Sequence, residues 1–275
     1  MDGIERLFAA VSALGCVICP RCGLPLVRAE NNLACAGGHT WNVNRRGTLN
    51  VLSVPHHDAY DAGLFAARRA VFGAGCYDAV AGAVESMLPA GPLRILDAGC
   101  GEGWYLNRLL SGRDGRSGAG VDISRDAIRL AAGQPCTALW CVADLRRLPF
   151  ADQSFNCVLD ILTPASYGEF RRLLAPDGCL IKVWPAEAYL REIREARGLS
   201  LYRDGDVGGW LAGHARIDAQ RRITYSVPVD AALWAAFVGM TPLNQDLTDE
   251  QKRRLADTPE QTVTIDMHIA RCRFD

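Results

Sequence analysis

Several features of other protein classes are missing from this sequence. No apolar run approaches the ~20 residues that a membrane-spanning helix needs, and residues 1–6 lack the basic and then apolar pattern of a secretory signal. Neither sign of charge is in excess, because 30 lysines and arginines stand against 31 acids for a formal net charge of −1. These absences predict a cytoplasmic protein without a membrane partner. They also count mildly against a dedicated RNA-binding protein, which is more often clearly basic.

The 11 cysteines do not indicate a disulfide scaffold. Such scaffolds are short and secreted, whereas this sequence has 275 residues and no secretory pattern. With 49% hydrophobic residues, the chain can form one large domain and a small one. Five cysteines lie in or beside apolar, strand-like segments, where small buried thiols are expected: Cys100, Cys136, Cys141, Cys157 and Cys179.

A glycine-rich segment is the most informative feature of the chain. Residues 97–103 (DAGCGEG) directly follow the apolar run 93–96 (LRIL), an order that predicts a buried strand, a tight turn and a helix. Glycine lacks a Cβ and adopts positive φ readily, so the backbone of this turn can approach a ligand closely. A second acid, Asp122, ends the next apolar run, where a carboxylate can accept both hydroxyls of a ribose.

The positions of the acids favour one nucleotide cofactor over another. In a dinucleotide site the helix N-terminus binds a pyrophosphate, which a carboxylate two residues before the first glycine would repel. Asp97 would instead attract the ammonium of an amino acid, which favours S-adenosylmethionine (SAM) over NAD. A third acid, Asp144, can accept from an adenine amino group; turn-forming or helix capping is the alternative role for all three. The predicted cofactor site comprises Asp97, Gly99, Gly101, Gly103, Asp122, Ile123, Asp144 and Leu145.

Four potential metal ligands lie near the N-terminus, in the order C-x2-C, twelve residues, C-x3-H. A structural zinc ion takes four tetrahedral ligands, and Cys3His is a common set. A short segment with little apolar content cannot fold around its own core, so metal binding would supply its folding free energy. Unligated cysteines are the alternative. The predicted ligands of this structural zinc are Cys19, Cys22, Cys35 and His39.

Residues 19–50 are the only locally basic part of the chain, and this favours a surface that grips the substrate. One acid, Glu30, stands there against four arginines: Arg21, Arg28, Arg45 and Arg46.

The pattern along the chain predicts four segments. They are a helical leader at 1–15, a zinc-binding module at 16–50, a linker and helical segment at 51–92, and a SAM-binding domain at 93–275. From 93 to 185 strand-like and helical segments alternate, which predicts an α/β fold with a doubly wound, mostly parallel sheet. Ligands of such sheets bind beyond the carboxyl ends of the strands. Apolar spacing further predicts a helix within 65–88 and a last strand at 262–273, expected as an antiparallel edge.

The three acids at successive strand ends resemble the motifs of class I SAM-dependent methyltransferases. The remaining motifs narrow this resemblance, since the zinc knuckle continues into HTWNVNRRGTLNVL at 39–52, YDAGLFAARRAVF at 60–72, GCY at 75–77 and MTPL at 240–243. In this order the chain resembles the bacterial 23S rRNA guanine-N1 methyltransferases, a family with macrolide-resistance members. The resemblance implies a Rossmann-like, seven-stranded catalytic domain and a zinc module that helps to hold a ribosomal RNA hairpin. A homodimer is also considered.

Three positions depart from the family pattern, all where a substrate base is expected. The family usually has Pro-Gly-x-x-His-Leu after the strand that ends at Trp184, whereas PAEAYL at 185–190 puts Tyr189 in place of the histidine. LNQD at 243–246 replaces an aromatic or histidine-bearing stretch, and Asp160 stands where the family tends to be neutral or basic. The cofactor half of the pattern is therefore intact, and the acceptor half is altered.

These departures provide the catalytic candidates. Guanine N1 must lose a proton, and Asp160 is the candidate for hydrogen bonding or proton acceptance, with a helix cap or salt-bridge partner as the alternative. Tyr189 is the candidate for orienting the substrate by stacking or hydroxyl donation, with a half-buried helix aromatic as the alternative. Arg68 and Arg69 would reach phosphates or the substrate, or form a solvated pair.

The sequence thus favours guanine N1 methylation of large-subunit ribosomal RNA. A paralogue that acts on a small metabolite, as a methyltransferase or by cyclising SAM itself, is the alternative, because the acceptor half is altered. A non-catalytic RNA-binding protein with a relic cofactor fold is disfavoured by the intact glycine-rich segment. Methyl transfer from a sulfonium is an in-line displacement, in which alignment of the reacting atoms supplies up to ~7–11 kcal/mol.

Overall fold

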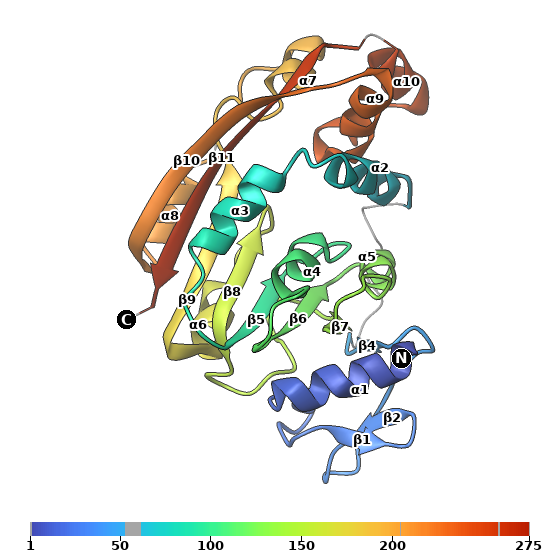
Figure 1. Ribbon diagram of the computed structural model, residues 1–275, viewed down its shortest axis with the longest axis vertical. Helices are drawn as coiled ribbons and strands as arrows, with labels where there is room; N and C mark the ends of the chain where they lie inside the picture. The colour runs from blue at the N-terminus through green and yellow to red at the C-terminus, as the bar shows by residue number, and fades with distance from the viewer. Residues whose placement is uncertain (1, 53–61, 204, 258, 275) are drawn as a thin grey trace.

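The computed structural model describes residues 2–52, 62–203, 205–257 and 259–274. A long, curved sheet forms its centre, with a small N-terminal module at one end and α7, α9 and α10 at the other (Figure 1). Residues 53–61 of the predicted linker lie outside the described residues.

The central sheet confirms the predicted α/β fold class. Its strand order is β10-β11-β9-β8-β5-β6-β7-β4, and all neighbours pair in parallel except β11, which is antiparallel to both β9 and β10. The segment at 262–273 was expected as an antiparallel edge strand; it is antiparallel, but it lies inside the sheet, and β10 forms the edge. The strands are β4 (Thr48–Asn50), β5 (Leu93–Ala98), β6 (Arg116–Asp122), β7 (Leu139–Val142), β8 (Phe155–Ile161), β9 (Leu174–Pro185), β10 (Arg216–Pro228) and β11 (Thr262–Arg273).

The eighth strand, β4, adds to the seven that the family resemblance implies. It belongs to the segment predicted as the zinc module, and it pairs in parallel with β7. This pairing covers backbone groups that β7 would otherwise expose at the sheet edge. The N-terminal module is thus joined to the catalytic sheet by main-chain hydrogen bonds.

Helices cover both faces of the sheet, as the doubly wound fold requires. One apolar cluster includes residues of α3, α4, α7 and α9, and a second includes residues of α1, α6 and α8. The helices are α1 (Gly3–Leu14), α2 (Ala62–Gly73), α3 (Asp78–Ser86), α4 (Trp104–Leu110), α5 (Arg125–Ala131), α6 (Tyr167–Leu173), α7 (Arg191–Ala196), α8 (Val207–Ala212), α9 (Ala231–Met240) and α10 (Asp249–Ala256), with a 3-10 turn η1 (Pro242–Asn244). Within the described ranges, none of them has the length and apolar character needed to cross a bilayer.

The helix predicted within 65–88 is two helices. The chain turns between α2 and α3 at Gly75, whose φ of 77° is in the left-handed region that glycine adopts most readily. The backbone N–H of Gly75 donates to the carbonyl of Phe72 and closes the turn. This break brings Tyr77 to the same side of the molecule as α2, next to the cavity described below.

The N-terminal module consists of α1 and a three-stranded antiparallel sheet of β1 (Val27–Ala29), β2 (Asn32–Ala34) and β3 (Thr40–Asn42). Helix α1, which lies in the predicted leader, is capped by Asp2 and buries Leu7 and Leu14 in the core. An ion pair of 2.6 Å between Arg28 and Glu5 joins the small sheet to α1. Helix α1 is therefore packed as part of the folded molecule.

Two glycines leave room for large side chains above the middle of the sheet. A Cβ on Gly120 of β6 would lie 2.3 Å from Trp140 Cζ3 and 3.0 Å from Cys100 Sγ. A Cβ on Gly118 would lie 2.9 Å from Leu106 of α4. Real Cβ atoms do not approach this closely, so these positions allow Trp140 and α4 to pack directly on the sheet backbone.

Replacing Gly120 with alanine should therefore destabilise the fold. We expect Gly120→Ala to lower the free energy of unfolding by about 1–3 kcal/mol, because Trp140 or the backbone must move. Gly82→Ala is the matched control: Gly82 is an exposed glycine in α3 with no atom within 4 Å of its ideal Cβ, and alanine there should add about 0.4–1 kcal/mol. Urea denaturation followed by circular dichroism measures both. Equal stability of the two variants would contradict the packing argument.

Candidate active site and metal centre

A cavity of about 780 Å³ lies beyond the carboxyl ends of the parallel strands, where doubly wound sheets bind their ligands. Loops after β5, β6, β7 and β8 form one wall, and α2, Tyr77, Tyr189 and residues 240–243 contribute to the opposite wall. The cavity brings together Tyr189 and six of the eight predicted cofactor residues: Gly99, Gly101, Asp122, Ile123, Asp144 and Leu145. Its volume is in the range of small-molecule sites.

The glycine-rich loop follows β5 as predicted, and its three glycines all have positive φ, between 55° and 77°. A Cβ on Gly99 would lie 2.5 Å from Thr163 Oγ1, and one on Gly103 would lie 2.5 Å from the Trp140 ring. The N–H groups of Gly99 and Cys100 both donate to the carbonyl of Val121, at 2.8 and 3.0 Å. The loop therefore packs closely against its neighbours, and its backbone at Gly99 and Gly101 forms the cavity floor.

Asp122, at the end of β6, ties this loop to the next one. Its Oδ2 accepts from the N–H of Gly101 and its Oδ1 from the N–H of Ser124, both at 2.9 Å. Ser124 in turn caps α5. Asp122 thus has the turn-forming role that was the alternative interpretation, and it also lines the cavity. Each carboxylate oxygen has a second lone pair, so the same group can accept ribose hydroxyls.

Asp97 lies beneath the loop, 2% exposed and outside the cavity lining. Within the described residues, its Oδ2 has no hydrogen-bond partner. Burial and the nearby negative charge of Asp122 raise the pKa of Asp97 to about 7. A buried carboxylate with one oxygen lacking a donor is a site for a cation, so this position fits the ammonium of SAM.

The loop's second acid, Glu102, was not among the predicted site residues. Its buried side chain pairs at 3.1 Å with Nε of Arg68 on α2. Arg68 lines the cavity, whereas Arg69 is not among the lining residues. The ion pair therefore links α2 to the cofactor loop. The acid between two glycines was the sequence signal for this contact.

Asp144 follows β7 and lines the cavity beside Ile123 and Leu145. Its carboxylate accepts from the backbone N–H of Arg146 at 2.9 Å and from that residue's guanidinium at 2.6 Å. The Arg146 side chain is 86% exposed, so the ion pair is of the weak, solvent-screened kind. The apolar side chains of Ile123 and Leu145 border the same space, a suitable environment for a purine ring.

The structure places Asp160 away from the cavity lining. Asp160 is fully buried, and Lys182 Nζ donates to its Oδ2 at 2.9 Å and to the carbonyl of Thr163 at 2.6 Å. Burial raises the pKa of Asp160 to about 6, although Lys182 opposes this shift. In this structure Asp160 is thus a salt-bridge partner, which was the alternative to its predicted role in catalysis. A lysine inside the apolar strand CLIKVW was the signal for a buried partner.

Tyr189 lines the cavity, and its hydroxyl lies 2.8 Å from that of Tyr77. Strand β11 holds the loop that carries Tyr189, because Asp266 Oδ2 accepts from the N–H of Ala188 at 2.9 Å. Burial would raise the pKa of Asp266, but hydrogen bonds from Arg222, Thr224 and Ala188 lower it to about 2. This carboxylate therefore stays ionised at neutral pH and fixes the loop.

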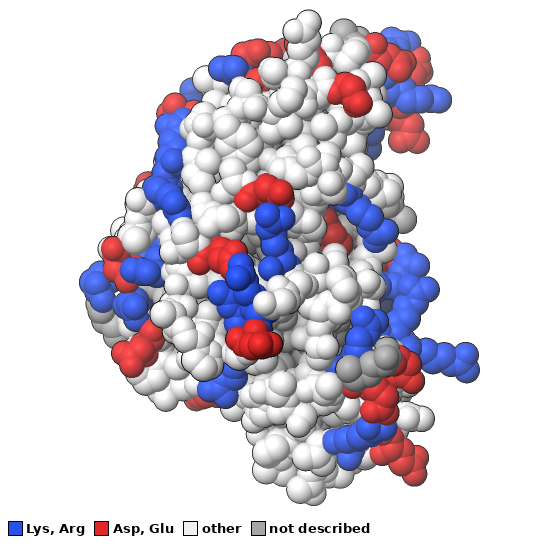
Figure 2. All heavy atoms as spheres, viewed as in Figure 1, with Lys and Arg blue, Asp and Glu red and all other residues white. Residues whose placement is uncertain are grey.

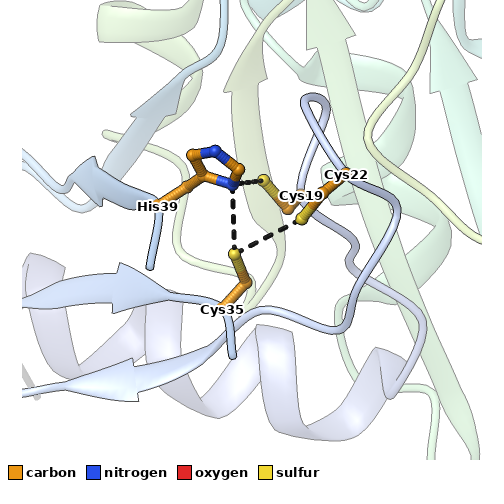
Figure 3. A group of neighbouring side chains, drawn as sticks. All are labelled: Cys19, Cys22, Cys35 and His39. Atoms are coloured by element: carbon orange, nitrogen blue, oxygen red, sulfur yellow. Dashed lines mark hydrogen bonds between the residues drawn. The ribbon is translucent and has the colours of Figure 1, made fainter. Parts of the chain in front are cut away.

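The four predicted metal ligands converge at one point (Figure 3). Their ligand atoms all lie within 4.8 Å of one another, with distances of 3.5 Å for Cys22 Sγ to Cys35 Sγ, 3.5 Å for Cys35 Sγ to His39 Nδ1 and 3.6 Å for Cys19 Sγ to His39 Nδ1. Zinc bonds of about 2.0–2.3 Å in a tetrahedron imply edges of roughly 3.3–3.8 Å, so the arrangement fits a zinc ion.

The surroundings of this cluster also suit a bound zinc. The indole N–H of Trp41 donates to Cys19 Sγ at 3.4 Å, as outer-shell donors do at metal-bound thiolates. A Cβ on Gly37 would lie 3.2 Å from Cys22 Sγ, which explains a glycine in the second knuckle. The residues present therefore fit the predicted structural zinc.

Two of the four arginines of the zinc module contact other residues of the N-terminal part of the chain. Arg28 pairs with Glu5, and the Arg21 guanidinium lies over the Trp41 ring, 5.6 Å from its centroid. Figure 2 shows lysine and arginine side chains along the right-hand edge of the molecule, with acidic side chains among them. This mixed surface agrees with the near-zero net charge.

Removing one zinc ligand should unfold the module. We expect His39→Ala to lose the bound zinc, about one ion per chain in the wild type, and to make residues 16–50 sensitive to protease, because metal binding supplies their folding free energy. Cys16→Ala is the matched control, since Cys16 is a buried thiol outside the ligand set. Elemental analysis and limited proteolysis measure the two effects. Full zinc retention by His39→Ala would rule out this ligand set.

The affinity for SAM should depend on pH through Asp97. Below its pKa of about 7 the carboxyl is protonated and cannot pair with an ammonium, so we expect SAM affinity to rise up to about tenfold per pH unit from pH 5.5 and to level off above about 7.5. The folding stability of the protein without SAM should change with pH in the opposite direction. Because the pKa of Asp97 is raised on folding, this group lowers the free energy of unfolding as pH rises from about 4 to 7. Isothermal titration calorimetry of wild type and Asp97→Asn measures the affinity. A pH profile shared by both proteins would contradict the assignment.

Comparison of the sequence with known proteins places this chain in a family. A family model described as a methyltransferase domain matches residues 95–178, which include the glycine-rich loop. A 23S rRNA (guanine(748)-N(1))-methyltransferase of Streptomyces fradiae is 34% identical over 268 residues, which cover 93% of this chain and 95% of the relative. A Bacillus subtilis protein provisionally named 23S rRNA (guanine-N(1)-)-methyltransferase YxjB is 33% identical over 271 residues, with 91% and 94% covered.

The matches to these two relatives cover more than nine-tenths of the chain. They confirm the predicted enzyme class, a SAM-dependent methyltransferase. The chain belongs to the 23S rRNA (guanine-N1) methyltransferase family.

Proposed function

We propose that the protein transfers a methyl group from SAM to N1 of a guanine in 23S rRNA. The observation that carries the proposal is the cavity of about 780 Å³, which is lined by six of the eight predicted cofactor residues and also by Tyr189, Tyr77 and Arg68. The names of the relatives that match more than nine-tenths of the chain favour a guanine of 23S rRNA over a small metabolite. We place the reaction in the cytoplasm, and a homodimer stays a prediction.

The cofactor half of the cavity, together with Asp97 buried below the loop, offers one group to each part of SAM. Asp97 would bind the ammonium, Asp122 the ribose hydroxyls and Asp144 the adenine amino group, while Ile123 and Leu145 would contact the adenine ring. Gly99, Gly101 and Gly103 would allow the loop backbone to approach the ligand. Bound SAM supplies an electrophilic methyl group on a sulfonium, and the chain has to align the acceptor with it.

The acceptor half is lined by aromatic rings that suit a guanine base. Phe65, Phe72, Tyr77 and Tyr189 line the cavity, and Phe72 stacks on Trp104 with 4.7 Å between centroids. A base in this space can stack on these rings, as unstacked RNA bases do on aromatic side chains. The rigid packing of Phe72 would fix the plane of the base.

Tyr189 would stabilise the negative charge that develops on the guanine as N1 loses its proton to water. As N1 deprotonates, negative charge spreads to the guanine O6, and a hydroxyl donor at O6 stabilises that charge. We assign this donor to Tyr189, with Tyr77 as its hydrogen-bond partner at 2.8 Å. Asp160 would contribute as a positioning residue, because its pair with Lys182 holds the carbonyl of Thr163 at the cavity rim.

The zinc module would hold the RNA outside the cavity. It is built from the locally basic segment, and Arg45 and Arg46 are both exposed there. Its strand β4 pairs with β7, so the module is positioned relative to the loop that carries Asp144. A hairpin bound to the module would thus reach the catalytic domain at a defined position.

Mass spectrometry of the products tests the proposal. Incubation of the protein with SAM and 23S rRNA should produce N1-methylguanosine at one position and S-adenosylhomocysteine in equal amount. Tyr189→Phe should lower kcat about 100-fold, as loss of one oxyanion donor does, and leave the affinity for SAM unchanged. Tyr167→Phe is the matched control, because Tyr167 lies outside the cavity lining. S-adenosylhomocysteine formed only with a small acceptor, or methylthioadenosine formed without one, would overturn the proposal.

A further inference from the structure

A second cavity lies beside the first, between α2, α9, η1 and α10. Its volume is about 360 Å³, and Leu64 and Thr241 line both cavities. The two spaces therefore share one wall. The other lining residues include Gly239, Asn244, Gln245 and Lys252.

Asn244 gives this second cavity an unused hydrogen-bond acceptor. The residue is 1% exposed, and its Nδ2 donates to the carbonyl of Val238 at 2.8 Å. Its Oδ1 has no partner in the part of the chain that the structure describes. Buried polar atoms are rarely left without a hydrogen bond, so this oxygen is suited to a ligand that brings a donor.

The position of Asn244 is fixed from outside the cavity. Arg197, the C-cap residue of α7, donates to the carbonyl of Leu243 and, at 2.7 Å, to the carboxylate of Asp246. The backbone N–H of Asn244 itself donates to the carbonyl of Thr241 at 3.2 Å. Residues on both sides of Asn244 are thus held, and the amide is presented at a defined place before any ligand binds.

Lys252 adds a cation to the lining of the same cavity. It is half-buried on α10, and its backbone N–H donates to the carbonyl of Thr248. Its charge acts on Asp246, whose pKa is lowered by a hydrogen bond from Arg197 and by the positive charges of Arg197 and Lys252. A neutral acceptor and a cation in one small cavity select a ligand with both a hydrogen-bond donor and a negative charge. A nucleotide with an exocyclic amino group and a phosphate has both.

We propose that this second cavity binds the nucleotide next to the methylated guanine. Asn244 Oδ1 accepts from an exocyclic amino group of its base, and Lys252 contacts its phosphate. The inference rests on the proposed function, because only a polynucleotide substrate carries a neighbour joined to the target base. The shared wall of Leu64 and Thr241 supports it, since two cavities that share these residues would hold neighbouring nucleotides next to each other.

The proposed contact between Lys252 and a phosphate is tested by steady-state kinetics with a 23S rRNA hairpin that contains the target guanine. Lys252→Gln should raise KM for the hairpin about tenfold, leave kcat and SAM affinity unchanged, and reduce the slope of log KM against log salt by about one, as loss of one phosphate contact does. Arg253→Gln is the matched control: it makes the same charge change on the same helix at an exposed residue outside the cavity. It should retain the wild-type slope.

Hairpins that differ in one amino group test the acceptor. The nucleotide next to the target is supplied as adenine or as purine, which lacks the exocyclic amine. The wild type should prefer adenine about tenfold in kcat/KM. Asn244→Ala should methylate both hairpins with about equal kcat/KM. Thermal unfolding checks that Asn244→Ala is folded. If it is not, the comparison of Lys252→Gln with Arg253→Gln gives an independent result.

The outcomes separate this inference from the proposed function. If the wild type methylates the hairpin but Lys252→Gln matches Arg253→Gln and Asn244→Ala keeps the adenine preference, the cavity holds water only and the inference is wrong. If the wild type does not methylate any hairpin while it transfers methyl groups to a small acceptor, the proposed function fails and the inference fails with it.

Discussion

The contact of the glycine-rich loop with three neighbours is the constraint on which the site depends. A Cβ on Gly99 would meet Thr163 at 2.5 Å, one on Gly101 would meet Arg68 at 3.3 Å, and one on Gly103 would meet Trp140 at 2.5 Å. Each glycine therefore makes room for a different element: the loop after β8, helix α2 and strand β7. This close packing fixes where the loop N–H groups point and sets the floor of the cavity between the strand ends.

The same loop couples the cofactor half of the site to the acceptor half. Glu102 lies between Gly101 and Gly103, and its buried carboxylate pairs with Arg68 on the opposite wall. An ion pair of this kind is costly to break because one buried charge is then left without a partner. Arg68 also lies 5.3 Å from the ring centroid of Phe72, so α2, its aromatic residues and the loop are held in one arrangement.

The parts of this molecule that could be predicted from the sequence are those encoded by local spacing. The DAGCGEG turn and the Cys3His spacing each lie within about twenty residues, and backbone geometry alone brings such groups together. The pairing of β4 with β7 and the insertion of β11 between β9 and β10 depend on contacts between distant segments. Asp160 shows the difference: its position at a strand end was predictable, but its partner Lys182 comes from the neighbouring strand.

The altered acceptor half can be understood from how its residues are supported. Tyr189 is carried by a loop that Asp266 of β11 holds through the N–H of Ala188, and Asn244 by a turn that Arg197 holds through the groups on either side. In both cases the support acts on the backbone or on a neighbouring residue and does not depend on the side chain at position 189 or 244. The glycine-rich loop has no such freedom, because all three glycines have positive φ and a Cβ at Gly99 or Gly103 would clash with Thr163 or Trp140. This difference is consistent with the prediction from the sequence that the cofactor half is intact and the acceptor half is altered.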